Sequence, residues 1–278
     1  MNSISKKKIK NLFKRYQIYP LKKFGQNFLI NKKLIKKIIK TADFKAKDFV
    51  LEIGPGIGNL TIELAKKVKK VIAIEKDIRM FQVLKDVLES YNIKNVEIIK
   101  KDILKIRNWK LKFRNLKVVA NLPHYIISPV IRKFLELKNQ PTLMVLMIQK
   151  EIAQKICALP PKMNLLAISV QFFAKPEIIS FVSKKCFWPE PKVDSAIIKI
   201  TSIKNKFENQ FKQKFFKIIK AGFSQPRKQL VNNLSKMLKL KKEKVKEWLL
   251  KNKINPQFRA QVLSIENWKD LTKTFIIK

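Results

Sequence analysis

Three closely spaced glycines followed by an acidic residue are the first pattern in this chain whose residue types and spacing could bind a ligand. The chain has only five glycines in 278 residues, and three of them are Gly54, Gly56 and Gly58. Glycine is kept where the backbone must adopt positive φ or let a ligand approach closely. Glu75 follows Gly56 by nineteen positions, and an acid at about that distance can accept hydrogen bonds from both hydroxyls of a ribose. The spacing favours a nucleotide-binding loop over a plain strand-to-helix turn.

The loop differs from a dinucleotide-binding loop in its spacing and charge. Dinucleotide sites space their glycines as Gly-x-Gly-x-x-Gly and offer a helix start to a pyrophosphate, whereas the spacing here is Gly-x-Gly-x-Gly. Glu52, two residues before the loop, would repel a pyrophosphate but suits the ammonium group of an amino acid. S-adenosylmethionine, a nucleoside with a cationic amino-acid arm and no phosphate, therefore fits better than NAD.

The elements around the loop must hold these groups at one edge of a sheet. Residues 49–53 read as a buried strand, and the apolar positions after them predict a helix capped by Asn59 or Thr61. A second strand begins at Val71 and ends at Glu75. Ligands of open α/β sheets bind beyond the carboxyl ends of the strands, where both the glycines and Glu75 are expected.

Alternating patterns continue to about residue 204 and predict an α/β fold with a doubly wound sheet. Further strands are predicted at 96–100, 117–120, 143–148 and 193–200, and helices at 31–41, 78–90 and 126–137. Beyond residue 205 only helical spacing recurs. We therefore divide the chain into a basic N-terminal extension (1–20), an α/β domain (21–204) and a small helical domain (205–278). Residues 5–16, rich in lysine, fit a frayed helix and an RNA-contacting arm equally well.

The charge of the chain points to a polyanionic partner. The formal net charge is +42 and the isoelectric point is near 10.3, as in proteins that bind nucleic acid with strong salt dependence. Only 7 of the 62 basic residues are arginine, which leaves 55 lysines, a bias also typical of an A+T-rich genome.

No apolar stretch approaches a membrane span or signal peptide, and Cys157 and Cys186 lack metal or disulfide spacing. We expect a cytoplasmic protein with reduced thiols and no metal.

Six motifs occur in order along the chain. They are Lys-Lys-Phe-Gly-Gln-Asn-Phe-Leu (22–29), Leu-Glu-Ile-Gly-Pro-Gly-x-Gly-x-Leu-Thr (51–61), Ile-Glu-Lys-Asp (74–77), Lys-Asp-Ile-Leu (101–104), Asn-Leu-Pro (121–123) and Phe-x-Pro-x-Pro-Lys-Val-Asp-Ser (187–195). Together they resemble the motifs of the ribosomal RNA adenine dimethyltransferases, specifically the small-subunit family known from kasugamycin sensitivity, and the resemblance extends from about Leu21 to Leu271. The resemblance implies a Rossmann-like class I methyltransferase fold and S-adenosylmethionine as the cofactor.

The resemblance also implies the residues that hold the cofactor. Residues 22–29 would form a lid segment over the amino-acid arm, with Asn27 and Leu29 above the glycine loop. Glu75 would bind the ribose and Asp102 the adenine amine. Asp102 alone could equally cap a strand end, but its predicted place at the edge of the sheet favours binding. The predicted cofactor-binding residues are Asn27, Leu29, Gly54, Gly56, Glu75, Asp102 and Asn121.

The predicted chemistry centres on Asn121 and Pro123. The exocyclic amine of adenine is a poor nucleophile because its lone pair is delocalised into the ring. If the Asn121 side-chain oxygen and the Pro123 carbonyl accept its two N–H groups, the nitrogen becomes pyramidal and its lone pair is freed. Positioning then supplies most of the rate, with no strong base. Asn-x-Pro by itself is also a common turn.

Two positions depart from the family. The family has Tyr or Phe where this chain has His124, its only histidine. The resemblance implies that this ring stacks on the target adenine while Phe187 closes from the other side. Imidazole has a smaller face but still stacks, so His124 is our predicted stacking residue and Tyr125 the alternative. A family arginine is replaced by Pro226, beside Arg227 and Lys228, where we expect a local change and no loss of the helix.

The resemblance implies a substrate of two adjacent adenines in the 3′-terminal hairpin loop of 16S ribosomal RNA, within an immature small subunit. A stacked adenine has to be flipped out to reach a pocket. Residues 221–230 and 259–264 resemble this family more than the macrolide-resistance methyltransferases of the large subunit. Two alternatives remain open: large-subunit methylation, and a non-catalytic RNA-binding assembly or transcription factor. We expect a monomer.

Overall fold

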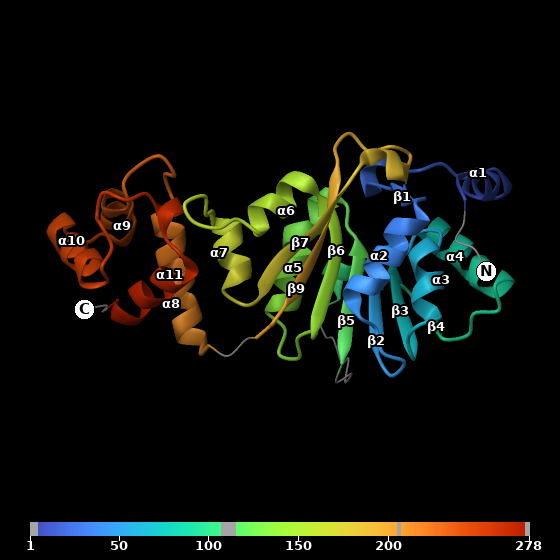
Figure 1. Ribbon diagram of the computed structural model, residues 1–278, viewed down its shortest axis with the longest axis horizontal. Helices are drawn as coiled ribbons and strands as arrows, with labels where there is room; N and C mark the ends of the chain where they lie inside the picture. Colours follow the sequence, from blue (N-terminus) through green and yellow to red (C-terminus); the bar gives the residue numbers. More distant parts are fainter. Residues whose placement is uncertain (1–4, 107–114, 205–206, 276–278) are drawn as a thin grey trace. The chain divides into compact units, whose positions relative to one another are not determined.

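The computed structural model describes residues 5–106, 115–204 and 207–275 (Figure 1). It divides into two compact units. The first comprises Met1–Ala153 with Lys175–Ile203, and the second comprises Gln154–Ala174 with Lys204–Lys278. None of the helices in the described ranges combines the length and apolar character needed to cross a bilayer.

The first unit is built on a mixed sheet. Among the described residues its strand order is β4-β3-β2-β5-β6-β9-β7. The strands are β2 (Phe49–Ile53), β3 (Lys70–Glu75), β4 (Val96–Lys100), β5 (Leu116–Asn121), β6 (Leu143–Gln149), β7 (Lys175–Val182) and β9 (Ser195–Thr201). Neighbours from β4 to β6 are parallel, and β9 is antiparallel to β6 and β7. The order reverses between β2 and β5, which is where such sheets bind ligands.

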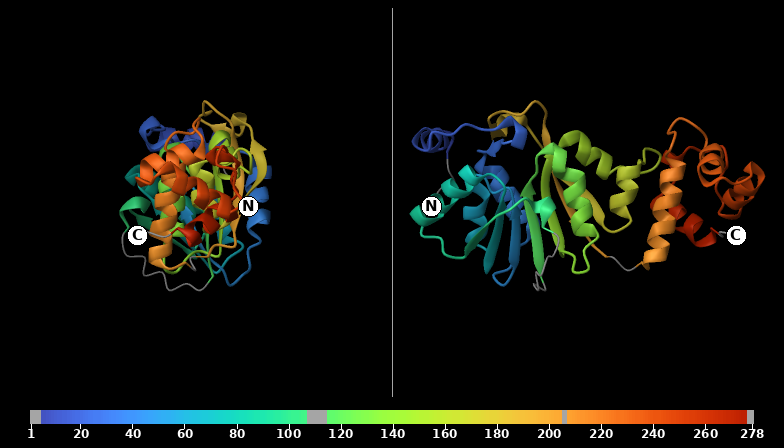
Figure 2. Two further views of the ribbon diagram at one scale, coloured as in Figure 1. Left: turned by 90° about the vertical axis from the view of Figure 1, so that its left-hand side faces the viewer. Right: turned by 180° about the vertical axis from the view of Figure 1, so that it is seen from behind.

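Helices cover both faces of this sheet. The helices that begin in this unit are α1 (Lys6–Arg15), α2 (Lys32–Ala42), α3 (Asn59–Ala65), α4 (Ile78–Ser90), α5 (Ile127–Leu135) and α6 (Lys150–Ile156). Figures 1 and 2 show the sheet from opposite sides, with α2 and α3 before one face and α5 before the other. Because both faces are covered, the central strands β2 and β6 are almost wholly buried apolar runs.

The elements predicted from the sequence occur in the structure, but the short elements β1 (Phe28–Leu29), β8 (Phe187–Trp188), α6 and α7 (Leu165–Gln171) were not predicted, strand β7 was missed and one helix cap was misassigned. The ends of the predicted strands and helices are shifted by three residues at most. Strand β7 was missed because its exposed residues hide the apolar pattern. The cap of α3 was predicted wrongly: the N-cap is Gly58, with φ of 86°. The side chain of Asn59 instead donates to the Leu29 carbonyl at 2.7 Å.

The N-terminal segment forms a docked helix. Helix α1 is capped by Ser5, and its Ile9 and Phe13 are 0% and 5% exposed. The Phe13 ring lies 5.3 Å from the rings of both Phe28 and Trp188. These two belong to β1 (Phe28–Leu29) and β8 (Phe187–Trp188), which pair antiparallel. The helix is therefore not frayed, and contact with RNA stays a prediction.

The second unit is helical. Its helices are α7 (Leu165–Gln171), α8 (Asn209–Gly222), α9 (Leu230–Leu238), α10 (Lys242–Lys251) and α11 (Ile265–Thr274). Short 3₁₀ helices in the two units are η1 (Lys22–Phe24), η2 (Ile103–Lys105), η3 (His124–Ile126), η4 (Lys184–Cys186) and η5 (Ala260–Val262). Pro226 lies before α9, which begins at Leu230 as expected.

Residues 154–174 pack in the second unit, although the sequence-based division gave them to the α/β domain. The Phe172 ring stacks on Phe215 at 4.2 Å and on Phe207 at 4.5 Å. The Met163 N–H donates to the Gln261 carbonyl at 2.9 Å. The predicted boundary at residue 204 adjoins residues 205 and 206, which lie outside the described part of the chain.

Gly222 gives a stability prediction for the second unit. A Cβ at this position would lie 2.3 Å from the Trp268 ring, which is fully buried. Gly222→Ala should therefore lower the free energy of unfolding by about 2 kcal/mol through overpacking, even though alanine favours helices. Urea unfolding followed by tryptophan fluorescence measures the loss. In a Trp268→Leu background, Gly222→Ala should lower the free energy of unfolding by less than it does in the wild-type protein. An equal loss in both backgrounds would contradict the contact.

Candidate active site

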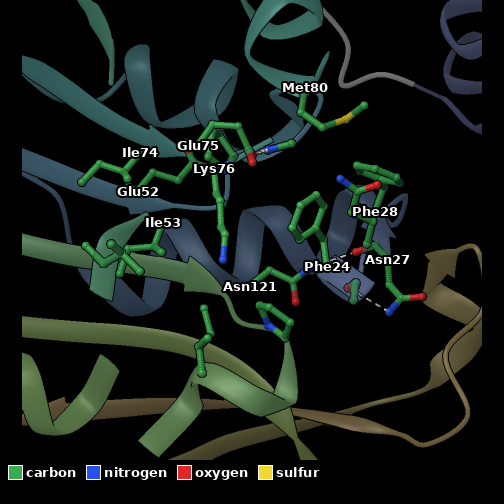
Figure 3. Close-up of a pocket in the computed structure, with 18 of the residues that line it drawn as sticks. Phe24, Asn27, Phe28, Glu52, Ile53, Ile74, Glu75, Lys76, Met80 and Asn121 are labelled. Atoms are coloured by element: carbon green, nitrogen blue, oxygen red, sulfur yellow. Dashed lines mark hydrogen bonds between the residues drawn. The ribbon is translucent and has the colours of Figure 1, made fainter. Parts of the chain in front are cut away.

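A pocket lies at the carboxyl ends of the parallel strands, beside the lid segment. Figure 3 shows Glu75 and Lys76 from the end of β3 and Asn121 from the end of β5 around the same space. All seven predicted cofactor-binding residues line it: Asn27, Leu29, Gly54, Gly56, Glu75, Asp102 and Asn121. The structure thus brings together residues that are up to 94 positions apart.

Glu75 is held by the backbone of the loop that it faces. One carboxylate oxygen accepts from the Gly56 N–H at 3.2 Å and the other from the Asp77 N–H at 2.8 Å. Burial raises the pKa of this carboxyl, while these backbone donors act against the shift. A carboxylate oxygen has more than one lone pair, so Glu75 retains acceptor capacity toward a ligand in the pocket.

Asp102 has two partners in the structure. It caps η2 by accepting from the Leu104 N–H at 2.9 Å, so the capping alternative describes part of its role. Its other oxygen lies 2.8 Å from the Lys76 ammonium. Burial acts to raise the pKa of Asp102, but the bonds from Lys76 and Leu104 outweigh it and the pKa is lowered. Asp102 is thus an ionised acceptor at the pocket edge.

The amide of Asn121 is fixed in orientation. Its Nδ2 donates to the Asn27 carbonyl at 3.0 Å, and the Asn27 side chain donates to the Gly25 carbonyl at 3.2 Å. Because Nδ2 is engaged by the lid segment, the side-chain oxygen is presented as an acceptor. This is the orientation that the predicted amine chemistry requires.

Pro123 also contacts the lid segment. A Cβ on Gly25 would lie 2.7 Å from the Pro123 Cβ, and Gly25 has a φ of +60°, so glycine is needed for this close approach. The Pro123 carbonyl accepts from the Ile126 N–H at 3.2 Å and keeps a second lone pair for another donor.

The two residues predicted to stack on the target adenine, His124 and Phe187, do not line the pocket, whereas Asn121 and Pro123 do. His124 is exposed and is not among the residues that line this pocket, whereas Tyr125, 44% exposed, does line it. The two rings are 6.2 Å apart and nearly perpendicular. Phe187 is 4% exposed and packs in the core cluster with Leu29. The roles of His124 and Phe187 stay predictions, and of the two neighbouring rings, His124 and Tyr125, it is Tyr125 that lines the pocket.

Sequence reasoning missed two residues that orient the lid segment. The Gln26 side chain accepts from the Leu21 N–H and donates to Asp77, both at 2.8 Å. Asn59 holds the Leu29 carbonyl. Gln26 and Asp77 belong to two of the six motifs, at 22–29 and 74–77. The presence of a polar side chain in each of these motifs was the only sequence feature that could have indicated the Gln26–Asp77 contact.

The pocket suits S-adenosylmethionine. At Gly54, whose φ is +68°, a Cβ would meet no atom within 4 Å, so the loop is open toward a ligand. The carboxyl groups of Glu52, Glu75 and Asp102 all line the pocket. Acidic groups of this kind bind hydroxyls, amines and cations better than they bind phosphates. Among the described residues, no group of three or more His, Cys, Asp or Glu side chains could hold a metal ion.

Comparisons with known proteins agree with this geometry. A dimethyladenosine transferase from Plasmodium falciparum superposes with a TM-score of 0.73 at 30% identity, covering 88% of this chain and 95% of that one. The 23S rRNA methyltransferase ErmE has the same TM-score at 24% identity, covering 89% and 98%, and shows the fold alone. The strand order and the strand-end acids define a class I S-adenosylmethionine-dependent methyltransferase.

The family follows from the sequence comparisons. The family model described as ribosomal RNA adenine dimethylase matches residues 21–276. Proteins named ribosomal RNA small subunit methyltransferase A are similar. One from Dehalococcoides mccartyi is 40% identical over 94% of this chain and 90% of its own. One from Caldanaerobacter subterraneus subsp. tengcongensis is 42% identical over 92% of this chain and 97% of its own. The chain belongs to the ribosomal RNA adenine dimethylase family.

Proposed function

We propose that this enzyme dimethylates the N6 amino groups of two adjacent adenines in the 3′-terminal hairpin loop of 16S ribosomal RNA during small-subunit biogenesis. The observation that carries the proposal is the Asn121 amide, whose nitrogen is bound by the Asn27 carbonyl so that its oxygen is the acceptor. The small-subunit enzymes to which the chain is similar support this RNA over the large-subunit alternative. The net charge of +42 suits an RNA partner.

The residues of this chain act by binding and orienting. The strand-end carboxylates Glu75 and Asp102 would hold the ribose and the adenine of S-adenosylmethionine, which supplies a methyl group on a positively charged sulfur. Asn121 and the Pro123 carbonyl accept the two N–H groups of a flipped adenine and free the lone pair of its nitrogen. The proton leaves only after methylation, when the nitrogen has become acidic, so no strong base is needed.

The test has two stages. Calorimetry measures S-adenosylmethionine binding, and tritiated methyl groups are then counted on immature small subunits, where about four per subunit are expected for two dimethylated adenines. Primer extension on both ribosomal RNAs separates small-subunit from large-subunit methylation. Binding without any transfer to RNA would favour the non-catalytic assembly factor. We also infer a monomer that works in the cytoplasm, where its immature subunit would be found.

The stacking residue can be identified by paired substitutions. Stacking of a base on an aromatic ring contributes about 1–3 kcal/mol. Because Tyr125 lines the pocket, we expect Tyr125→Ala to raise the KM for small subunits by about tenfold, for roughly 1.4 kcal/mol, and His124→Ala to raise it less. Steady-state methylation with saturating cofactor measures both. A larger effect of His124→Ala would return the stacking role to the histidine.

A further inference from the structure

Helix α1 has a buried face for which the proposed chemistry gives no role. The helix precedes the lid segment and contains none of the six motifs. Its Ile9 and Phe13 are buried, whereas all five of its lysines are exposed. An amphipathic helix covers an apolar surface with its buried face, so the identity of that surface decides what α1 contributes to the enzyme.

The surface that α1 covers is the outer side of the pocket wall. Ile9 and Phe13 belong to a core cluster that also contains Phe28, Ile57 and Met80. These last three residues line the pocket, and Figure 3 shows Phe28 and Met80 there. They come from three different elements, which are β1, the glycine loop and α4. The side chains of α1 therefore pack behind the same residues that face a ligand in the pocket.

Phe13 reaches the glycine loop through a single ring. It meets the Phe28 ring edge to face, with the ring centroids 5.3 Å apart and the planes at 83°. A Cβ on Gly56 would lie 2.9 Å from Cε1 of Phe28, so this ring rests against the loop backbone at a position where glycine admits it. The Gly56 N–H in turn donates to Glu75 at 3.2 Å. A shift of the Phe28 ring would therefore disturb the backbone that orients Glu75.

Two polar contacts fix α1 on α4. The Tyr16 hydroxyl donates to the Asp86 carboxylate. The Lys8 ammonium donates to the Tyr91 hydroxyl at 2.9 Å and lies 4.7 Å from the centre of the Tyr91 ring. Asp86 belongs to α4 and Tyr91 is the C-cap of that helix. Because α4 also supplies Met80 to the pocket wall, α1 is attached to the wall at both the lid segment and α4.

We propose that α1 is the outer layer of the cofactor site and that Phe13 is a positioning residue, which keeps Phe28 against the glycine loop and so sets the affinity for S-adenosylmethionine. Phe13 does not line the pocket and acts only through Phe28. Removing its ring leaves a cavity behind Phe28, and a loop that is no longer preorganised binds its ligand less tightly. The inference concerns cofactor binding and is the same whichever RNA the enzyme methylates.

Calorimetry on two variants tests the role of Phe13. Phe13→Ala should raise the Kd for S-adenosylhomocysteine about tenfold, a usual size for coupling between two sites. Phe13→Leu, which keeps an apolar side chain, should raise it by only about threefold. The kcat at saturating cofactor should stay within about twofold of the wild-type value, since Phe13 touches no reacting atom. A merely structural role would instead reduce the number of binding sites found by calorimetry and lower kcat, and would leave the Kd of the folded molecules unchanged.

Two control variants separate this effect from charge and from general loss of packing. Lys10→Gln changes the exposed face of α1, and Phe215→Leu replaces a fully buried ring in the second unit. Both should keep the wild-type Kd for S-adenosylhomocysteine. A wild-type Kd in Phe13→Ala would overturn the inference. If Phe13→Ala does not fold, a wild-type Kd in Phe13→Leu has the same meaning. A wild-type protein that binds no S-adenosylhomocysteine would instead reject the cofactor, so the two failures are distinguishable.

Hydrogen exchange of the wild-type protein provides a readout that needs no variant. Coupling between two events in one protein is reciprocal, so a ligand that binds more tightly when α1 is docked must also stabilise the docked helix by the same factor. Saturating S-adenosylhomocysteine should therefore slow amide exchange about tenfold in the peptide that contains residues 6–15. The peptide that contains residues 242–251 of α10, in the second unit, should exchange at unchanged rates. Equal exchange of residues 6–15 with and without the ligand would overturn the inference.

Discussion

Replacing Asn121 by alanine is expected to lower the kcat for methylation of immature small subunits by about 100-fold to 1,000-fold. That range is the usual effect of removing one preorganised hydrogen-bonding group from a reacting centre. The side-chain oxygen is oriented by the bond from Nδ2 to the Asn27 carbonyl, so the substrate amine loses an acceptor that is already in place. Single-turnover methylation with tritiated cofactor measures the effect.

Cofactor binding serves as the control for this variant. Asn121 also lines the cofactor pocket, and the substitution removes its hydrogen bond to the Asn27 carbonyl of the lid segment. The Kd for S-adenosylmethionine should therefore rise by only a few-fold. Asn95→Ala removes an asparagine that bonds to the Ala65 and Val68 carbonyls away from the pocket, and should retain the parental rate. Methylation by Asn121→Ala at the wild-type rate would refute the role of Asn121.

Glu75→Ala is expected to weaken S-adenosylmethionine binding by about 150-fold. Two hydrogen bonds to a charged acceptor contribute about 1.5 kcal/mol each at the lower end of their range, and roughly 3 kcal/mol corresponds to that factor. The substitution also removes the acceptor of the Gly56 and Asp77 N–H groups, so the glycine loop loses part of its support. Calorimetry at pH 7.5 measures the Kd.

The pH dependence of binding supplies an independent check on Glu75. Burial raises the pKa of this carboxyl, and only its ionised form accepts from both ribose hydroxyls. Cofactor affinity should therefore decrease as the pH falls through that raised pKa, and the decrease should be absent in Glu75→Ala. Glu97→Gln on β4, an exposed partner of Lys70 at 2.6 Å, is the matched control. Tight binding by Glu75→Ala would remove Glu75 from the site.

The features that sequence predicted well are local. The glycine loop and Glu75 follow from spacing within one strand–helix–strand unit, because the parallel pairing of β2 and β3 brings Ile53 beside Ile74 and so places both ends at one edge. The motif at 121–123 was located for the same reason, since β5 is the other neighbour of β2.

The features that sequence missed depend on contacts distant along the chain. The cap of α3 was misassigned because Asn59 is used by Leu29, thirty residues earlier. Residues 154–174 were assigned to the α/β domain because nothing in their own pattern shows that Phe172 stacks on Phe215. Whether His124 or Tyr125 faces the pocket depends on a single turn of 3₁₀ helix, in which adjacent side chains point in different directions.

The stacking of Phe172 on Phe207 and Phe215 has a consequence for how this protein can be divided and recombined. The helical unit is assembled from two stretches of chain separated by β7 and β9, so a fragment cut at residue 204 would leave Phe207 and Phe215 without the ring on which they stack. Chimaeras that exchange specificity between relatives must therefore transplant both stretches together, and a gene fusion that moves only the tail would be expected to yield an insoluble product.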